Sequence, residues 1–139
     1  MAFDLSKKEN QLSVLAEEGV EFELKHPDTD EPLDAFIKVR GARSKTAERH
    51  LRKMINEQAR EEAIRSRGKD KDKPRPIEES IEGMNEIAYV RVISWRGIED
   101  QGVPYELTKE NALALFERES WIRDQILEVS NNAERFLPE

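Results

Sequence analysis

The sequence predicts an α+β protein that is mostly α-helical, with an N-terminal β-hairpin packed on a small helical bundle. Apolar residues occupy every second position over 20–24 and again over 35–39, and this period of two is typical of half-buried strands. From residue 45 onward, apolar residues recur at intervals of three and four, which is the period of amphipathic helices. An isolated hairpin is marginal in water, so this one must pack on the helices or extend another sheet.

The chain length favours one domain, residues 1–139, because domains most often contain about 100–150 residues. Leu, Ile, Val and Phe together number 33, which is above the share below which charged chains are usually disordered. We divide the chain into a short helix with the hairpin, a basic helix, a mobile charged linker and a helical C-terminal part. These segments span residues 1–42, 43–66, 67–76 and 77–139, respectively.

The N-terminal segment is expected to form a helix over 6–18 that Gly19 ends, because glycine is favoured just after a helix. Two strands then follow around a loop at 26–32 that is dense in turn-forming residues. The inward-facing strand residues are expected to be Val20, Phe22, Leu24, Ala35, Ile37 and Val39.

The next helix is placed at 45–66, where Ser44 or Thr46 can cap its first turn. Its apolar stripe is thin and consists of Ala47, Leu51, Met54, Ile55, Ala59 and Ala63. The linker at 67–76 alternates charge sign and contains two prolines and no apolar residue, a composition typical of mobile linkers.

A second long helix is expected from Ile77 through Trp95, although the tract 87–93 is β-branched enough to fit a strand. Residues 96–105 contain two glycines and are expected to form a loop. Thr108 is expected to cap a helix that ends at Phe116, and Ser120 a last helix that continues to 136.

The net charge of −7 is unevenly distributed, being −5 over residues 1–42, +6 over 43–76 and −8 over 77–139. The basic middle segment can neutralise the acidic ends within the fold or in an oligomer. It can also bind an anionic partner such as nucleic acid. For the second possibility the candidate basic face contains Arg49, Arg52, Lys53 and Arg60. Glutamates interleave with these residues at helical spacing, and no aromatic residue between Phe36 and Tyr89 could stack on a base.

No pattern of catalytic residues is found, and we expect no enzyme, cofactor or metal. The chain has no Cys and two His, which excludes thiol nucleophiles, disulfides and thiolate metal sites. The stretch 41–46 lacks the glycine that a phosphate-binding loop needs before its lysine. His26, Asp28, Asp30 and Glu31 could gather a cation, but their spacing fails the EF-hand pattern and suits a solvated turn. A carboxylate pair with a divalent ion is a further alternative.

Neither a membrane-spanning run nor a signal peptide is visible, so we expect a cytoplasmic protein. The longest uninterrupted apolar run covers residues 112–116, against about 20 residues for a bilayer. The first eight residues lack the basic and apolar regions of a secretion signal.

The C-terminal half resembles the phage tail assembly chaperones of long-tailed bacteriophages. The most specific features are Trp95-x-Gly97-Ile98, which ends an apolar helix, and the pair Asn111-Ala112 in a Thr-capped helix. An amphipathic last helix with Trp121 and a Phe at 136 adds to the resemblance. In the N-terminal part, the Glu-Glu-Gly at 17–19, the His-Pro-Asp-Thr turn at 26–29 and Gly41-x-x-Ser44 are similar too. The linker has no counterpart in that family.

The resemblance implies a non-catalytic protein of a phage or prophage. Members of the family keep the tape measure protein soluble, help to recruit tail tube proteins, and are absent from the finished virion. It therefore implies a cytoplasmic location in the bacterial host and association of several copies with a helical protein. A homo-oligomer is a further expectation. A nucleic-acid-binding accessory or regulatory protein that uses the basic 43–76 segment is the alternative.

The residues proposed to bind a partner are Trp95, Gly97, Ile98, Tyr105 and Trp121. They fall in the loop-rich C-terminal part, where exposed aromatic side chains could contact another protein. The other interpretation is that both tryptophans lie in the core, since aromatic side chains dominate core packing. Gly97 would then supply the backbone freedom of a turn.

Overall fold

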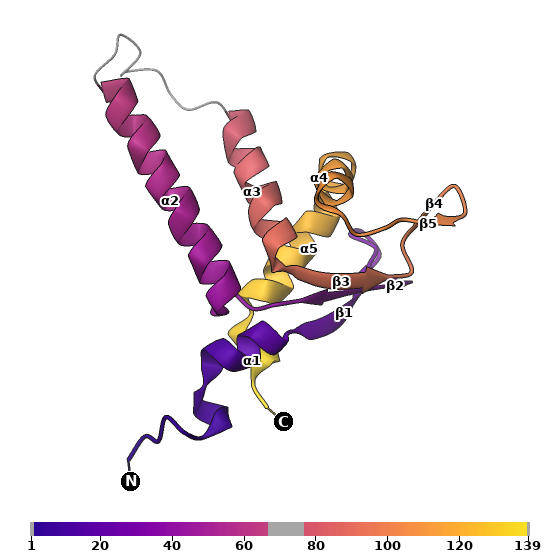
Figure 1. The fold of residues 1–139 in the computed structure, drawn as a ribbon. Coiled ribbons are helices and arrows are strands. Elements are labelled where there is room, and N and C mark those ends of the chain that lie inside the picture. Colours follow the sequence, from indigo (N-terminus) through magenta and orange to yellow (C-terminus); the bar gives the residue numbers. More distant parts are fainter. Residues whose placement is uncertain (1, 67–76, 139) are drawn as a thin grey trace.

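The computed structural model describes residues 2–66 and 77–138, and the predicted linker at 67–76 lies outside this range. Figure 1 shows a three-stranded sheet with α4 and α5 on one side, from which two long helices, α2 and α3, project together. We call these two helices the α2–α3 arm. The described ends of the chain lie on the opposite side from the tip of this arm (Figure 1). The α+β class, mostly helical with an N-terminal hairpin, is confirmed.

The sheet is antiparallel and has the order β1 (Val20–Lys25), β2 (Pro32–Val39), β3 (Val92–Arg96). Val20 pairs with Val39 in the predicted hairpin, and Ile37 pairs with Trp95 on the other side of β2. The prediction of helix through Trp95 is therefore wrong, because α3 (Ile77–Arg91) ends four residues earlier. Strand β3 pairs with the backbone N–H and C=O groups on the second edge of β2, which a lone hairpin would leave unpaired.

The N-terminal helix is shorter than predicted. A 3₁₀ turn, η1 (Lys8–Asn10), precedes α1 (Leu12–Glu18) where one helix over 6–18 was expected. Helix α1 ends just before Gly19, as predicted.

Helix α2 (Lys45–Ser66) begins at a side-chain cap. The Ser44 hydroxyl accepts a 3.1 Å hydrogen bond from the Ala47 N–H, and Ser44 is fully buried. The N–H of Thr46 instead bonds to a Glu17 carboxylate oxygen at 3.0 Å. Ser44 is therefore the cap, and the stretch that resembles a phosphate-binding loop serves as a helix start.

The C-terminal part begins with a small hairpin, β4 (Glu99–Asp100) and β5 (Val103–Pro104), inside the predicted loop. Helix α4 (Lys109–Arg118) follows, and the Thr108 hydroxyl caps it by accepting the Asn111 N–H at 3.1 Å, as predicted. Helix α5 (Ser120–Asn131) comes next.

The predicted last helix to 136 is wrong at both ends. Ser120 is the first residue of α5, and no side-chain cap bond precedes it. The helix stops at Asn131, and a 3₁₀ turn, η2 (Ala133–Phe136), follows. The Ser130 carbonyl accepts the Ala42 N–H at 3.0 Å. If α5 continued, this carbonyl would accept a backbone N–H from the next helical turn. It instead accepts one from the connection between β2 and α2.

The hydrophobic core lies between one face of the sheet and helices α3, α4 and α5. Its fully buried large side chains are Phe116, Ile37, Ile126 and Val39. They come from β2, α4 and α5, so these elements share one core. Most of α2 lies outside this core, since its contacts are with α3 and, near its start, with α1.

Candidate functional site

Trp95 and Tyr105, two of the predicted partner-binding residues, lie against each other beside β3. The Trp95 Nε1–H donates a 2.7 Å hydrogen bond to the Tyr105 carbonyl, and the two rings stack with centroids 6.2 Å apart. The Tyr105 hydroxyl in turn donates to the Asn111 carbonyl in α4 at 2.9 Å. Both rings are partly buried against the core. This group therefore fastens the segment between β3 and α4 to the body of the protein.

Gly97 and Ile98 belong to the same structural group. Gly97 has a φ of +81°, and a β-carbon there would lie 2.6 Å from the Asp34 carbonyl oxygen. Ile98 packs against the core, and its carbonyl accepts the Tyr105 N–H at 2.8 Å. Four of the five candidates thus have structural contacts that hold residues 96–105 in place.

Trp121, the fifth candidate, lies in the first turn of α5, where it lines a shallow hollow of about 510 Å³ between α5 and the hairpin. Its indole N–H donates to a Glu119 carboxylate oxygen at 2.8 Å. Gln125 also faces this hollow and exchanges two hydrogen bonds with the backbone of Lys25, at 3.1 and 2.7 Å. The side chain of Gln125 thereby joins α5 to strand β1.

The candidate cation ligands at the hairpin loop form a turn. His26 Nδ1 accepts the backbone N–H groups of Asp28 and Thr29 at 3.1 and 3.3 Å. Across residues 2–66 and 77–138, no three side chains of His, Asp or Glu gather closely enough to hold a metal ion. The two bonds to His26 Nδ1 stabilise the turn between the strands of the hairpin.

The predicted basic residues Arg49, Arg52, Lys53 and Arg60 do lie together on α2 and line one shallow hollow. All four are exposed, and none forms an ion pair within 4 Å with a described residue. The glutamates that interleave with these four therefore form no ion pair with them. Of those glutamates, Glu48 pairs with Lys45 instead, at 3.8 Å.

The α2–α3 arm also carries an exposed apolar face. Met54 and Gly83 face each other, since a β-carbon at Gly83 would lie 3.4 Å from the Met54 methyl. When two residues face each other across a pair of antiparallel helices, the next residue of each helix projects toward the same side of the pair. Ile55 and Met84 therefore share a face, and Leu51 and Ile81 extend it by one turn.

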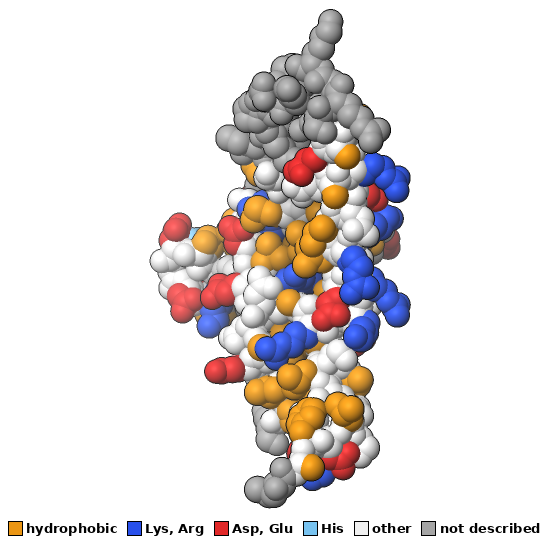
Figure 2. Space-filling view, turned by 90° about the vertical axis from the view of Figure 1, so that its left-hand side faces the viewer, with side chains coloured by type: hydrophobic (Ala, Val, Ile, Leu, Met, Phe, Trp, Pro, Cys, Tyr) orange, Lys and Arg blue, Asp and Glu red, His pale blue; other side chains and the backbone are white. Residues whose placement is uncertain are grey.

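These four side chains are 38–57% exposed. Figure 2 shows hydrophobic side chains along the arm, beside a row of Lys and Arg side chains. We call the surface of Leu51, Ile55, Ile81 and Met84 the apolar arm face. Its residues have the helical spacing of a core stripe, and no described element covers them.

His50 lies between the two helices of the arm, in a pocket that also contains Glu86 and Lys109. Partial burial lowers the pKa of His50, Glu86 opposes that shift, and the nearby cations add to it. Further down α3, burial lowers the pKa of the Arg91 guanidinium, which donates to Asn131 Oδ1 at 2.6 Å. The Arg91 bond joins α3 to the end of α5.

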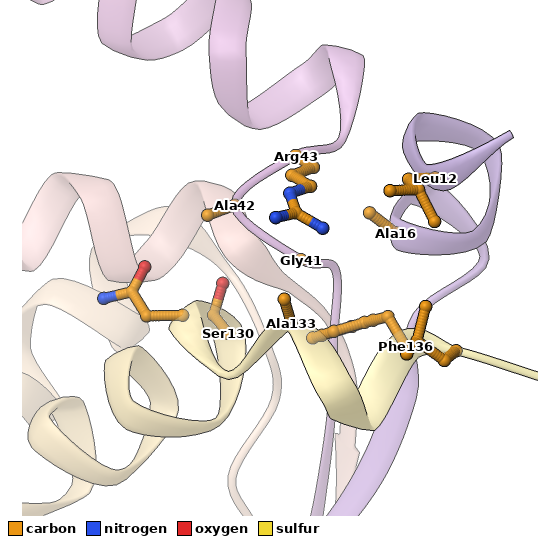
Figure 3. A pocket seen from close by; sticks show the side chains of 10 residues that line it. Leu12, Ala16, Gly41, Ala42, Arg43, Ser130, Ala133 and Phe136 are labelled. Carbon is orange, nitrogen blue, oxygen red and sulfur yellow. The ribbon is translucent and has the colours of Figure 1, made fainter. Parts of the chain in front are cut away.

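A second apolar surface surrounds a hollow of about 120 Å³ near the chain ends (Figure 3). Leu12 and Ala16 of α1 form one wall and Ala133 and Phe136 of η2 another, and residues 41–43 close it toward α2. We call this the terminal hollow. It was not anticipated from the sequence, because its residues come from three separate segments and none forms a known motif.

The sequence profile of the YdaY prophage protein family matches residues 40–139, which is more than two thirds of the chain. The chain belongs to this family. Neither a curated protein nor a solved structure matches it.

The YdaY match begins at the end of β2, so it includes the α2–α3 arm, the basic face and both tryptophans. It confirms that this is a phage or prophage protein. None of the described helices is both long and apolar enough to span a lipid bilayer.

Proposed function

We propose that this YdaY-family protein is a non-catalytic tail assembly chaperone, which binds the tape measure protein and helps to recruit tail tube subunits in the host cytoplasm. The observation that carries the proposal is the apolar arm face. Exposed hydrophobic surface on a projecting helix pair is suited to accept an amphipathic helix of another protein. A tape measure protein offers long helices of this kind.

The spacing of the apolar arm face supports this mode of binding. Leu51 and Ile55 are one turn apart on α2, and Ile81 and Met84 are one turn apart on α3. Together they provide two parallel rows, between which the apolar side chains of a bound helix can pack. Burial of such side chains contributes about 25 cal/mol per Å² of apolar surface.

The basic residues of α2 supply a second element of recognition. Arg52 lies three residues before Ile55 on α2, at the border of the apolar arm face, and it forms no ion pair within 4 Å with a described residue. A partner helix with acidic residues beside its apolar stripe would be attracted to this edge. Such contacts favour encounter and orientation more than final affinity, and they weaken as salt screens them.

The test is co-expression of the full chain with the tape measure protein of the same phage or prophage, followed by co-purification and measurement of its soluble fraction. We expect the double variant Leu51→Ser/Ile55→Ser to lose co-purification with at most a small fall in melting temperature, because Leu51 and Ile55 are 40% and 57% exposed. Val103→Ser is the matched control, since Val103 is 63% exposed on β5. A tape measure protein that is equally soluble without this chain would contradict the proposal.

The second candidate function is nucleic-acid binding through the basic face, and the absence of ion pairs to Arg49, Arg52, Lys53 and Arg60 within the described residues favours it. Phosphate contacts are strongest at low salt, so a gel-shift series at rising salt concentration tests it. Binding that Arg49→Ala/Lys53→Ala weakens uniformly across sequences would support this function. A lack of binding at the lowest salt would exclude it.

A further inference from the structure

We propose that the terminal hollow binds the N-terminal segment, residues 3–5, of a second copy of this chain. In this contact Phe3 enters the hollow and Asp4 pairs with Arg43. The contact uses neither the apolar arm face nor the basic face, and so it does not depend on the proposed function.

The hollow has the size and lining for one apolar side chain. Its volume of about 120 Å³ is close to that of the engineered cavity of about 150 Å³ that binds a benzene ring. Phe136 is buried at its base, while Leu12 and Leu137 are 36% and 47% exposed at its border. An aromatic ring that entered it would therefore cover apolar surface that is now in contact with water.

The hollow also has one unpaired charge. Arg43 is exposed, its side chain reaches toward the hollow from the connection between β2 and α2 (Figure 3), and it forms no ion pair with a described residue. The natural occupant is thus an apolar side chain next to a carboxylate.

The N-terminal segment has this chemistry. Phe3 and Leu5 are 69% and 73% exposed, the two most exposed large hydrophobic residues described, and Asp4 lies between them. Hydrogen bonds from Ser6 lower the pKa of Asp4, which keeps its carboxylate charged.

Hydrogen bonds hold the segment in a defined turn. The side chains of Asn10 and Gln11 donate to the carbonyls of Asp4 and Leu5 at 2.7 and 2.9 Å. Figure 1 shows the segment extending away from the body of the protein. It is therefore presented to another molecule.

A contact between two different surfaces of the same chain is heterologous, so it produces rings or open chains and leaves one segment and one hollow available in any linear assembly. This property supplies a sharp test. A chain that lacks a working segment and a chain that lacks a working hollow can still form one contact with each other.

The experiment is sedimentation equilibrium of the full chain over a range of concentrations. We expect the mass of the wild type to rise with concentration, and Phe3→Ser and Arg43→Glu each to abolish the rise. Val103→Ser, which removes an apolar side chain of similar exposure on β5, should leave it unchanged.

Charge exchange in trans completes the test. D4K and R43E chains should each be monomeric alone and should associate in equal proportion when mixed, because the exchanged charges and the native pair of Asp4 and Arg43 both attract between the two kinds of chain. A wild type that is monomeric at every concentration would overturn the proposal. Association that F3S and R43E leave intact would overturn it too.

Discussion

The indole N–H of Trp95 donates a 2.7 Å hydrogen bond to the main-chain carbonyl of Tyr105, and their rings stack at an angle of 18°. The polar atom of Trp95 is thus already used inside the protein. Trp95→Phe keeps an aromatic ring but leaves the carbonyl without this donor, so we expect unfolding to require about 1–2 kcal/mol less free energy. Urea denaturation followed by circular dichroism measures this loss.

The same variant separates the two interpretations of this tryptophan. If Trp95 acts only within the fold, W95F should bind a partner as well as the wild type does, at temperatures where both are folded. A variant with normal stability and lost partner binding would show that Trp95 belongs to a binding surface.

A second prediction compares two glycines that both have positive φ angles, +81° at Gly97 and +78° at Gly102. A β-carbon at Gly97 would lie 2.6 Å from the Asp34 carbonyl oxygen, whereas nothing lies within 4 Å of one at Gly102. Gly102→Ala should therefore cost only the backbone strain, about 1 kcal/mol, and Gly97→Ala clearly more. If thermal unfolding shows the same loss of stability for both variants, the segment after β3 can move away from β2 without a free-energy cost.

The hairpin, Gly19 and the Thr108 cap could be predicted because each depends on a few neighbouring residues. Strand β3 could not, because residues 92–96 fit either structure until the free edge of β2 is known to lie beside them. That edge is more than fifty residues away in sequence. The pairing of β3 with β2 depends on tertiary structure, which the spacing of apolar residues within 92–96 does not predict.

The candidate sites show the same limit. The apolar stripe of α2 was visible, but whether Leu51 and Ile55 are covered depends on elements elsewhere in the chain. Arg49 and Lys53 were found as a group because they are one turn apart on one helix. The terminal hollow was missed, since residues 12, 43 and 136 come together only through the packing of α1 and η2.

A third prediction concerns Glu17, which joins α1 to the start of α2. Its carboxylate accepts hydrogen bonds from the Thr46 N–H and Arg40 Nε, both at 3.0 Å. Burial raises the pKa of Glu17, but the bonds from Thr46 and Arg40 outweigh it, so the pKa is lowered overall. We expect Glu17→Gln to cost about 1 kcal/mol or less, because the side chain is 38% exposed.

The pH dependence of that loss has a definite sign. A lowered pKa in the folded state stabilises the protein above the unfolded value of about 4.5, and this stability disappears as pH falls through the folded pKa. The wild type should therefore lose its advantage over E17Q in acid. Glu18→Gln is the control, since Glu18 pairs with Lys8 on the surface, both of them more than half exposed, and it should change stability little.

The last prediction concerns His50, whose pKa is lowered chiefly by burial between α2 and α3. The unfolded chain then binds a proton more readily than the folded one near the ordinary value of 6.5. The contribution of His50 to stability is complete above that value, and it decreases as pH falls from there toward the folded pKa. Urea unfolding at a series of pH values should show the wild type losing stability relative to His50→Asn as the pH is lowered.

Glu86 provides the second half of this test, because its carboxylate raises the pKa of His50 against the effects of burial, Lys109, Lys53 and Arg91. Glu86→Gln removes that opposing charge, so the folded pKa of His50 should fall further. The loss of stability in acid should then continue to lower pH in E86Q than in the wild type. A difference between wild type and H50N that stays constant with pH would show that His50 is as hydrated in the arm as in the unfolded chain.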